Sequence, residues 1–227
     1  MSVDISNFLI ATPLPVSDTN PVALEIPGLE ALERCPEVIR LLEDGSLQMT
    51  ALTLGASSKS VKRTRCEWKE SAYWSLSSTD RHWSRQEMIL EKVNSAQKVV
   101  IAQIHVKDAN TPPLKVFWNR GNITAGFRAS FDRPDIENVT VCAGVPLGTK
   151  FKLNIGVTRS GKVQINGTCN GVAFEPCNLQ MNYSWQRQLL QFHGGVYNQV
   201  DYSDTTAADD GSVCVIKALT VTHSSVE

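Results

Sequence analysis

Lys-Val-Val-Ile-Ala-Gln-Ile-His-Val, residues 98–106, is the stretch that decides the fold class. β-Branched residues dominate it, and such residues favour strands. Side chains alternate between the two faces of a strand, so Gln103 and His105 share one face while Ile104 and Val106 point to the other. The stretch predicts a strand that packs an apolar face on a core and turns a polar face outward.

Two further segments alternate in the same way, with other polar residues on the shared face. These residues are Arg63, Arg65, Glu67 and Lys69 in the first segment, and Gln191, His193, Tyr197 and Gln199 in the second. If the three segments are neighbours in one sheet, a single surface carries arginine, lysine, glutamine, histidine and tyrosine together. Such a surface suits an anionic ligand and proton transfer.

Strand patterns recur along most of the chain. They cover 47–54, 66–76, 98–106, 114–120, 123–131, 139–145, 150–159, 162–168, 188–200 and 213–223, with turn residues between them. About ten strands without alternating long helices predict an all-β sandwich. We expect a single domain over residues 1–227, in which residues 1–46 are irregular apart from a short helix. The helical pattern at 28–44 is interrupted by Pro36, which predicts two short pieces.

The composition of the chain limits the classes of partner that we expect it to bind. The chain has 227 residues, a formal net charge of −1 and 42% hydrophobic residues. A nearly neutral chain has no global field that steers it to nucleic acid or a membrane surface, and no apolar run approaches the roughly 20 residues that span a bilayer. We expect no nucleic-acid or membrane partner, and we expect the protein to act as a monomer.

The six cysteines form no CxxC pair, and no His, Asp and Glu cluster has metal-ligand spacing. We therefore expect no metal and no other cofactor. Cys169 and Cys177 are close enough in sequence to bridge a loop, although free cysteines are also common in cores. The first residues lack the basic start and apolar stretch of a signal peptide. A secreted location would follow if a leader had been removed.

The three polar segments resemble the signatures of polysaccharide lyase family 7, the alginate lyase family. Residues 65–70, RCEWKE, resemble its R-(S/T)-E-(L/V)-R-E motif, and residues 103–105, QIH, match its Q-(I/V)-H motif. Residues 191–199, QFHGGVYNQ, resemble Y-F-K-A-G-x-Y-x-Q. The motifs occur in the family's order, and the likeness extends from about Leu47 to the C-terminus. It implies a jelly-roll β-sandwich with a substrate groove on one concave sheet.

The resemblance also implies a reaction, the β-elimination of 1,4-linked uronic-acid polymers, which leaves 4,5-unsaturated uronate ends. Arg65 and Gln103 match the residues that neutralise the substrate carboxylate, and His105 and Tyr197 match the residues that move protons. We expect Arg63, Glu67, Lys69, Gln191, His193 and Gln199 to contact the substrate. Neighbouring Arg65 and Lys69 are expected to lower the pKa of Tyr197.

The sequence departs from the family pattern at three positions: Lys69 replaces an arginine, His193 a lysine and Gln191 a tyrosine. These changes leave the polymer open between alginate, especially polymannuronate, and β-1,4-glucuronan. Two other classes of function fit these residues less well. A lectin-like sandwich without catalysis would not need the Arg, Gln, His and Tyr set. A glycoside hydrolase needs two carboxylic acids, and the three polar faces hold only Glu67.

Overall fold

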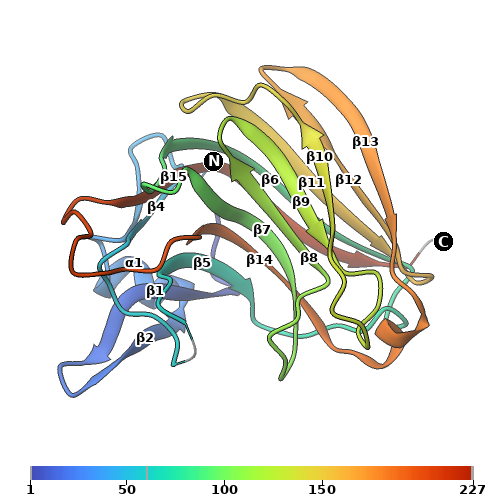
Figure 1. Ribbon diagram of the computed structural model, residues 1–227, viewed down its shortest axis with the longest axis horizontal. Coiled ribbons are helices and arrows are strands. Elements are labelled where there is room, and N and C mark those ends of the chain that lie inside the picture. Colours follow the sequence, from blue (N-terminus) through green and yellow to red (C-terminus); the bar gives the residue numbers. More distant parts are fainter. Residues whose placement is uncertain (1, 60, 226–227) are drawn as a thin grey trace.

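The computed structural model describes residues 2–59 and 61–225, which form two antiparallel sheets packed face to face (Figure 1). The eight-stranded sheet has the order β10 (Glu137–Cys142), β9 (Asn122–Phe127), β8 (Leu114–Asn119), β7 (Lys98–Val106), β14 (Leu190–Asn198), β5 (Arg65–Glu70), β1 (Phe8–Ser17) and β2 (Asn20–Pro27). This architecture confirms the predicted β-sandwich.

The seven-stranded sheet covers one face of the first. Its order is β13 (Val172–Gln180), β12 (Lys162–Cys169), β11 (Lys150–Thr158), β6 (Arg81–Lys92), β15 (Gly211–Ser224), β4 (Leu47–Leu52) and β3 (Ile39–Leu41). The described helices are α1 (Gly28–Arg34) and the 3-10 helix η1 (Tyr183–Arg187). Neither has the length and apolar character needed to cross a membrane.

The three polar segments are neighbours, as the alternation required. β14 pairs with β7 on one side and with β5 on the other. His193 lies opposite Gln103 of β7 and Lys69 of β5, and Tyr197 lies opposite Arg65. Since cross-strand partners point to the same face of a sheet, this register gathers the polar side chains on one surface.

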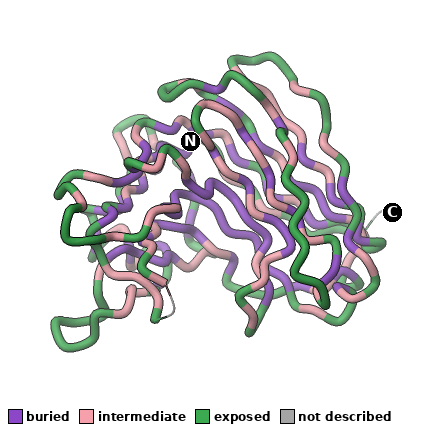
Figure 2. The backbone as a smooth tube through the Cα atoms, viewed as in Figure 1, coloured by how far each residue is buried: buried purple, intermediate pink, exposed green. Residues whose placement is uncertain are grey.

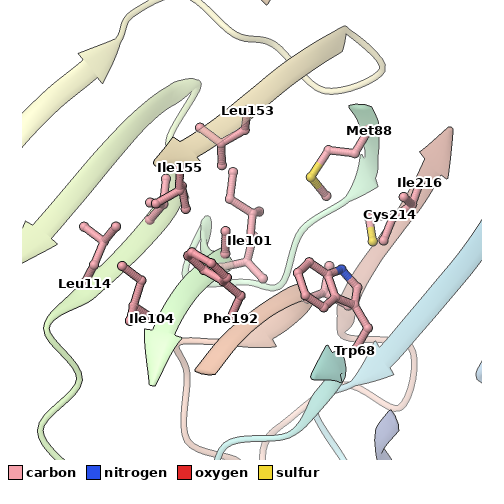
Figure 3. Close-up of a cluster of buried hydrophobic side chains, with 14 of the residues drawn as sticks. Trp68, Met88, Ile101, Ile104, Leu114, Leu153, Ile155, Phe192, Cys214 and Ile216 are labelled. Atoms are coloured by element: carbon pink, nitrogen blue, oxygen red, sulfur yellow. The ribbon is translucent and has the colours of Figure 1, made fainter. Parts of the chain in front are cut away.

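The apolar faces of the two sheets meet in a single core. Figure 3 shows Trp68 and Phe192 of the eight-stranded sheet facing Met88, Leu153 and Ile216 of the other. Buried segments run along the central strands, while exposed segments lie mostly at the turns and at the outer strands (Figure 2). Each fully buried side chain of this size contributes about 1.5–3 kcal/mol, so packing of the two sheets holds the polar surface in place.

A β-bulge in β7, two residues before Gln103, interrupts the alternation of side chains between the two faces of the sheet. Val100 and Ala102 lie opposite the consecutive residues Phe117 and Val116 of β8, so Ile101 is the extra residue. Ile101 and Ala102 consequently both belong to the hydrophobic core. A bulge re-aims the side chains that follow it, and here it sets the register of Gln103 and His105.

The two glycines of β14 allow close packing within the protein. A Cβ on Gly194 would lie 2.6 Å from the Trp68 ring, and Gly195 has a φ of +123° with the Cys66 carbonyl oxygen 2.4 Å from its ideal Cβ position. The pair makes room for the core tryptophan and for the neighbouring strand.

The N-terminal part is more regular than expected. Residues 2–46 hold the strands β1, β2 and β3 besides α1, and the second helical piece predicted after Pro36 is replaced by β3. Pro15 sits at a register shift between β1 and β2, where the ladder tolerates a proline. The pattern also missed β6 and β13. Charged residues on the outer face of β6 obscure its strand character, and β13 is mostly exposed and contains Pro176.

Candidate active site

A groove with a volume of about 480 Å³ lies on the outer face of the eight-stranded sheet, over β5, β7, β8 and β14. The four residues expected to carry the reaction all line it. Of the six residues expected to contact the substrate, two line it as well. The predicted residues brought together in this groove are Arg65, Lys69, Gln103, His105, His193 and Tyr197.

Glu67 lies beneath the groove and holds two of its residues. The carboxylate is completely buried. It accepts a hydrogen bond from Gln103 Nε2 at 2.8 Å and pairs with Arg65 Nη1 at 3.3 Å. Burial raises the pKa of Glu67, while the Arg65 guanidinium acts in the opposite direction. A buried carboxylate is tolerable only with such partners, so the arrangement fixes the orientation of Arg65 and Gln103.

His193 belongs to a hydrogen-bonded chain that runs back to the main chain of β5. The Gln191 amide nitrogen donates to the backbone oxygen of Glu70, which leaves its amide oxygen 2.8 Å from His193 Nε2. An amide oxygen can only accept, so Nε2 of His193 carries the proton. Burial lowers the pKa of His193 well below its ordinary value. The ring is therefore a neutral part of the groove wall, where the family pattern has a cation.

His105 stacks on His193, with ring centroids 5.0 Å apart and planes 7° from parallel. Its Nδ1 atom is buried and has no hydrogen-bond partner among the described residues. Burial, assisted by the Arg65 charge, lowers the pKa of His105 to about 4. The imidazole is consequently neutral at pH 7 and is able to accept a proton.

Tyr197 lies at the groove beneath a cation. The Arg65 guanidinium carbon is 3.8 Å from the centre of its ring, and Lys115 Nζ is 5.4 Å from the same point. The expected lowering of the Tyr197 pKa is wrong: burial raises it, and the opposing effect of Arg65 is smaller. The phenol therefore keeps its proton at neutral pH.

Lys115 is a groove residue that the sequence analysis missed. It lies on β8 directly opposite Gln103, and it lines the same cavity. Burial lowers its pKa, against the opposing attraction of Glu67. The signal in the sequence was weak, because the outward positions of β8 are Lys115, Phe117 and Asn119, of which only Lys115 is charged. The sequence does not show that β8 pairs with β7, and it is this pairing that places Lys115 beside Gln103.

The other predicted contact residues lie around or behind the groove. Lys69 lines the groove and is ion-paired to Glu25 of β2. Arg63 lines a separate hollow, where it binds Asp201 at 2.7 Å and Gln199 at 3.4 Å. Glu67 and Gln191 are buried supports. Contact between substrate and Arg63, Glu67, Gln191 or Gln199 thus stays a prediction.

Two histidines form a second cluster outside the groove. His82 is completely buried and stacks on Trp74, with ring centroids 4.1 Å apart. Its Nδ1 is 2.7 Å from that of His223, and His223 Nε2 is 2.6 Å from Glu70 Oε1. Burial lowers the pKa of His82 to about 4. The strand patterns in the sequence did not include β6, so nothing marked His82 as a buried residue.

Within residues 2–59 and 61–225, no set of three His, Cys, Asp or Glu side chains is arranged to hold a metal ion. The six cysteines are free, so Cys169 and Cys177 do not form the bridge that their spacing allowed.

Comparison with known proteins defines the class to which this fold and groove belong. A family model described as alginate lyase matches residues 3–223. The protein is therefore a polysaccharide lyase. The chain belongs to the alginate lyase family, polysaccharide lyase family 7, as its three motifs indicated.

Solved structures share the jelly-roll fold over almost the whole chain. An alginate lyase from Pseudomonas aeruginosa has a TM-score of 0.83 at 23% identity, with 97% of this chain and 99% of that chain covered. An alginate lyase from Klebsiella pneumoniae has a TM-score of 0.82 at 19% identity, with coverages of 98% and 97%. Alginate lyase A1-II′, a member of polysaccharide lyase family 7, has a TM-score of 0.80 at 20% identity, with 99% of this chain and 97% of that chain covered. No curated protein sequence matches this chain.

Proposed function

We propose that the protein cleaves 1,4-linked uronic-acid polymers by β-elimination, with alginate as the first candidate polymer. The observation that carries the proposal is the convergence of a cation, an amide, a neutral imidazole and a phenol in one groove. Arg65, Gln103, His105 and Tyr197 supply these groups. Solved relatives of similar fold include an alginate lyase in complex with a substrate, which supports the choice of polymer.

The reaction removes the proton on C5, next to the sugar carboxylate. As that proton leaves, the C4–O4 bond breaks, its electron pair leaves with O4, and a C4=C5 double bond forms. Negative charge grows on the carboxylate, so a fixed cation and an amide donor lower the barrier. Arg65 offers a planar fork that suits a carboxylate. Gln103 uses one amide proton on Glu67, and its second, which lies 3.5 Å from the accepting Nδ1 of His193, would turn to the substrate carboxylate.

The protonation states suggest which residue takes and which gives the proton. His105 is neutral and serves as the base, while Tyr197 keeps its proton and donates it to O4. This two-residue route fits guluronate, in which H5 and O4 lie on opposite sides of the ring. In mannuronate and glucuronate they lie on the same side, where Tyr197 alone would serve after losing its proton.

Hydrolysis of the glycosidic bond is disfavoured by the carboxylates that are present. It requires two carboxyl groups that flank the scissile bond. Glu67 is buried and held by Arg65 and Gln103, and Glu25, which lines the groove, is paired to Lys69. Neither is a free acid beside an open site.

The test is a panel of polymers: polymannuronate, polyguluronate, β-1,4-glucuronan and a neutral glucan. Cleavage is followed by the ultraviolet absorbance of the unsaturated uronate end. We expect activity on at least one acidic polymer and none on the neutral glucan. Glucuronan is included because neutral His193 and paired Lys69 change the groove wall without altering the four reacting residues. Absence of product from every acidic polymer would refute the proposal.

A further inference from the structure

The outer face of the seven-stranded sheet carries an aromatic and cationic platform, on the side of the sandwich opposite the groove. Inward positions of β6 are buried, and the alternate positions, which include Arg81, Trp83 and Arg85, point outward. Trp83 lies opposite Gly156 of β11, and Gly156 lies opposite Gln164 of β12. The outward residues of three neighbouring strands therefore form successive cross-strand rows.

Trp83 lies against the sheet because Gly156 has no side chain. A Cβ at position 156 would be 2.6 Å from two atoms of the benzene ring of Trp83. A hollow of about 200 Å³ remains beside the ring, lined by Arg81, Lys162 and Gln164 among others. A glycine weakens the interior of a strand and often marks the close approach of another group. At position 156 that group is the ring of Trp83, which packs flat on the surface of the sheet.

Positive charge surrounds the ring. Arg81 and Lys162 flank the hollow, and the Arg85 guanidinium carbon is 4.5 Å from the ring centre. The carboxylate of Glu87, on the same face, is already paired with Lys150 and Lys152, both at 3.3 Å. No carboxylate among the described residues pairs with Arg81, Arg85 or Lys162, although the chain as a whole has a net charge of −1.

A ladder of amides extends from the hollow, which one of its members, Gln164, lines. Asn154 Nδ2 donates to Asn166 Oδ1 at 2.9 Å, Asn166 Nδ2 to Gln164 Oε1 at 3.2 Å, and Gln164 Nε2 to Asn178 Oδ1 at 3.2 Å. Each amide group still has a free proton or lone pair with which to bind a hydroxyl group. The ladder orders these groups in advance, which lowers the entropic cost of binding.

We propose that this platform, built on Trp83, Arg81, Arg85 and Lys162, is a second, non-catalytic binding site for an acidic polysaccharide. The ring offers an apolar surface to a sugar, the amides bind hydroxyl groups, and the cations bind carboxylates. The platform and the groove lie on opposite outer faces of the sandwich, so a short oligosaccharide occupies one of them at a time. The identity of the polymer rests on the proposed function, whereas the preference for anions rests on the platform itself.

The experiment measures retention of the full chain in native gels that contain alginate, β-1,4-glucuronan or a neutral glucan. All proteins carry Tyr197→Phe, so that the polymer is not degraded. The platform variants are Trp83→Ala and the double variant Arg81→Ser/Lys162→Ser, which leaves the aromatic packing intact. The matched control is Arg34→Ser/Arg133→Ser, which removes two exposed cations from α1 and from the loop after β9.

We expect the double variant to bind an acidic polymer about fivefold more weakly, a change of the size that exposed ion pairs produce. Trp83→Ala should also weaken binding, because it removes the apolar surface for the sugar, and the control should bind normally. With Tyr197 intact, turnover of a short oligosaccharide should be unchanged in the platform variants. Equal retention of platform and control variants on every acidic polymer would overturn the proposal, as would an equal loss on the neutral glucan. If the parent protein cleaves no uronan, the retention result still decides the platform independently.

Discussion

The guanidinium of Arg65 lies over the ring of Tyr197, with 3.8 Å between its central carbon and the ring centre. The same guanidinium is bound from below by Glu67. Arg65 is therefore held in place by a buried carboxylate and a ring before any substrate arrives. Preorganised charge of this kind stabilises a developing anion without reorganisation during the reaction.

Tyr197→Phe removes the hydroxyl group and keeps the aromatic ring, so it distinguishes the role of the hydroxyl group from that of the ring. We expect turnover to fall by about 10²- to 10⁴-fold, the usual contribution of a positioned acid or base. Polymer binding should remain, because phenylalanine keeps the ring on which Arg65 rests. Product formation and retention on an acidic polymer are measured for the same preparation. Turnover close to that of the parent protein would rule out Tyr197 as the proton donor.

The pH dependence of kcat/KM follows from the lowered pKa of His105 and the raised pKa of Tyr197. His105 acts as a base only when neutral, so activity should persist as the pH falls and be lost near pH 4, where the ring becomes protonated. Tyr197 acts as an acid only when protonated, and its raised pKa moves the alkaline loss above its ordinary value near 10. Initial rates across this range give both limits. An acid limit near the ordinary histidine pKa, about 6.5, would contradict the assignment.

Sequence patterns predicted the sandwich and the central part of the site because both depend on alternation. The segments around Arg65, Gln103 and Tyr197 each showed their polar face, and family motifs supplied their order. Lys115 escaped notice because β8 contains a single charged residue on that face, and only the pairing of β8 with β7 brings it opposite Gln103. Strand order is a tertiary property that local alternation does not specify.

The protonation states were the least predictable part of the site. Charges near Tyr197 are visible in the sequence, but the burial that outweighs them depends on packing around the groove. His82 shows the same limit in a different way, since its strand carries exposed arginines on the other face and resembles a solvated segment. Desolvation changes a pKa as strongly as neighbouring charges do, and it cannot be read from spacing alone.

Buried neutral histidines should make the fold sensitive to acid. The pKa of His82 is about 4 in the folded protein and about 6.5 in the unfolded chain. Between these values the unfolded chain binds more protons, so the free energy of unfolding falls as the pH decreases from 6.5 toward 4. His82→Phe keeps the stack on Trp74 and removes this contribution. Urea unfolding at pH 7 and pH 5 should show a smaller difference for the variant than for the parent protein, and equal differences would exclude His82 as a contributor.

His193→Lys restores the residue type of the family pattern and tests what the neutral ring does. The lysine loses the stack on His105 and the hydrogen bond to Gln191, so we expect kcat to fall about tenfold through misplacement of the base. The added ammonium also brings charge to the groove, so KM for an acidic polymer should rise more steeply with salt. His193→Gln is the matched neutral control: it should lower kcat while the salt dependence of KM stays that of the parent protein. An unchanged kcat in both variants would show that His193 does not position His105.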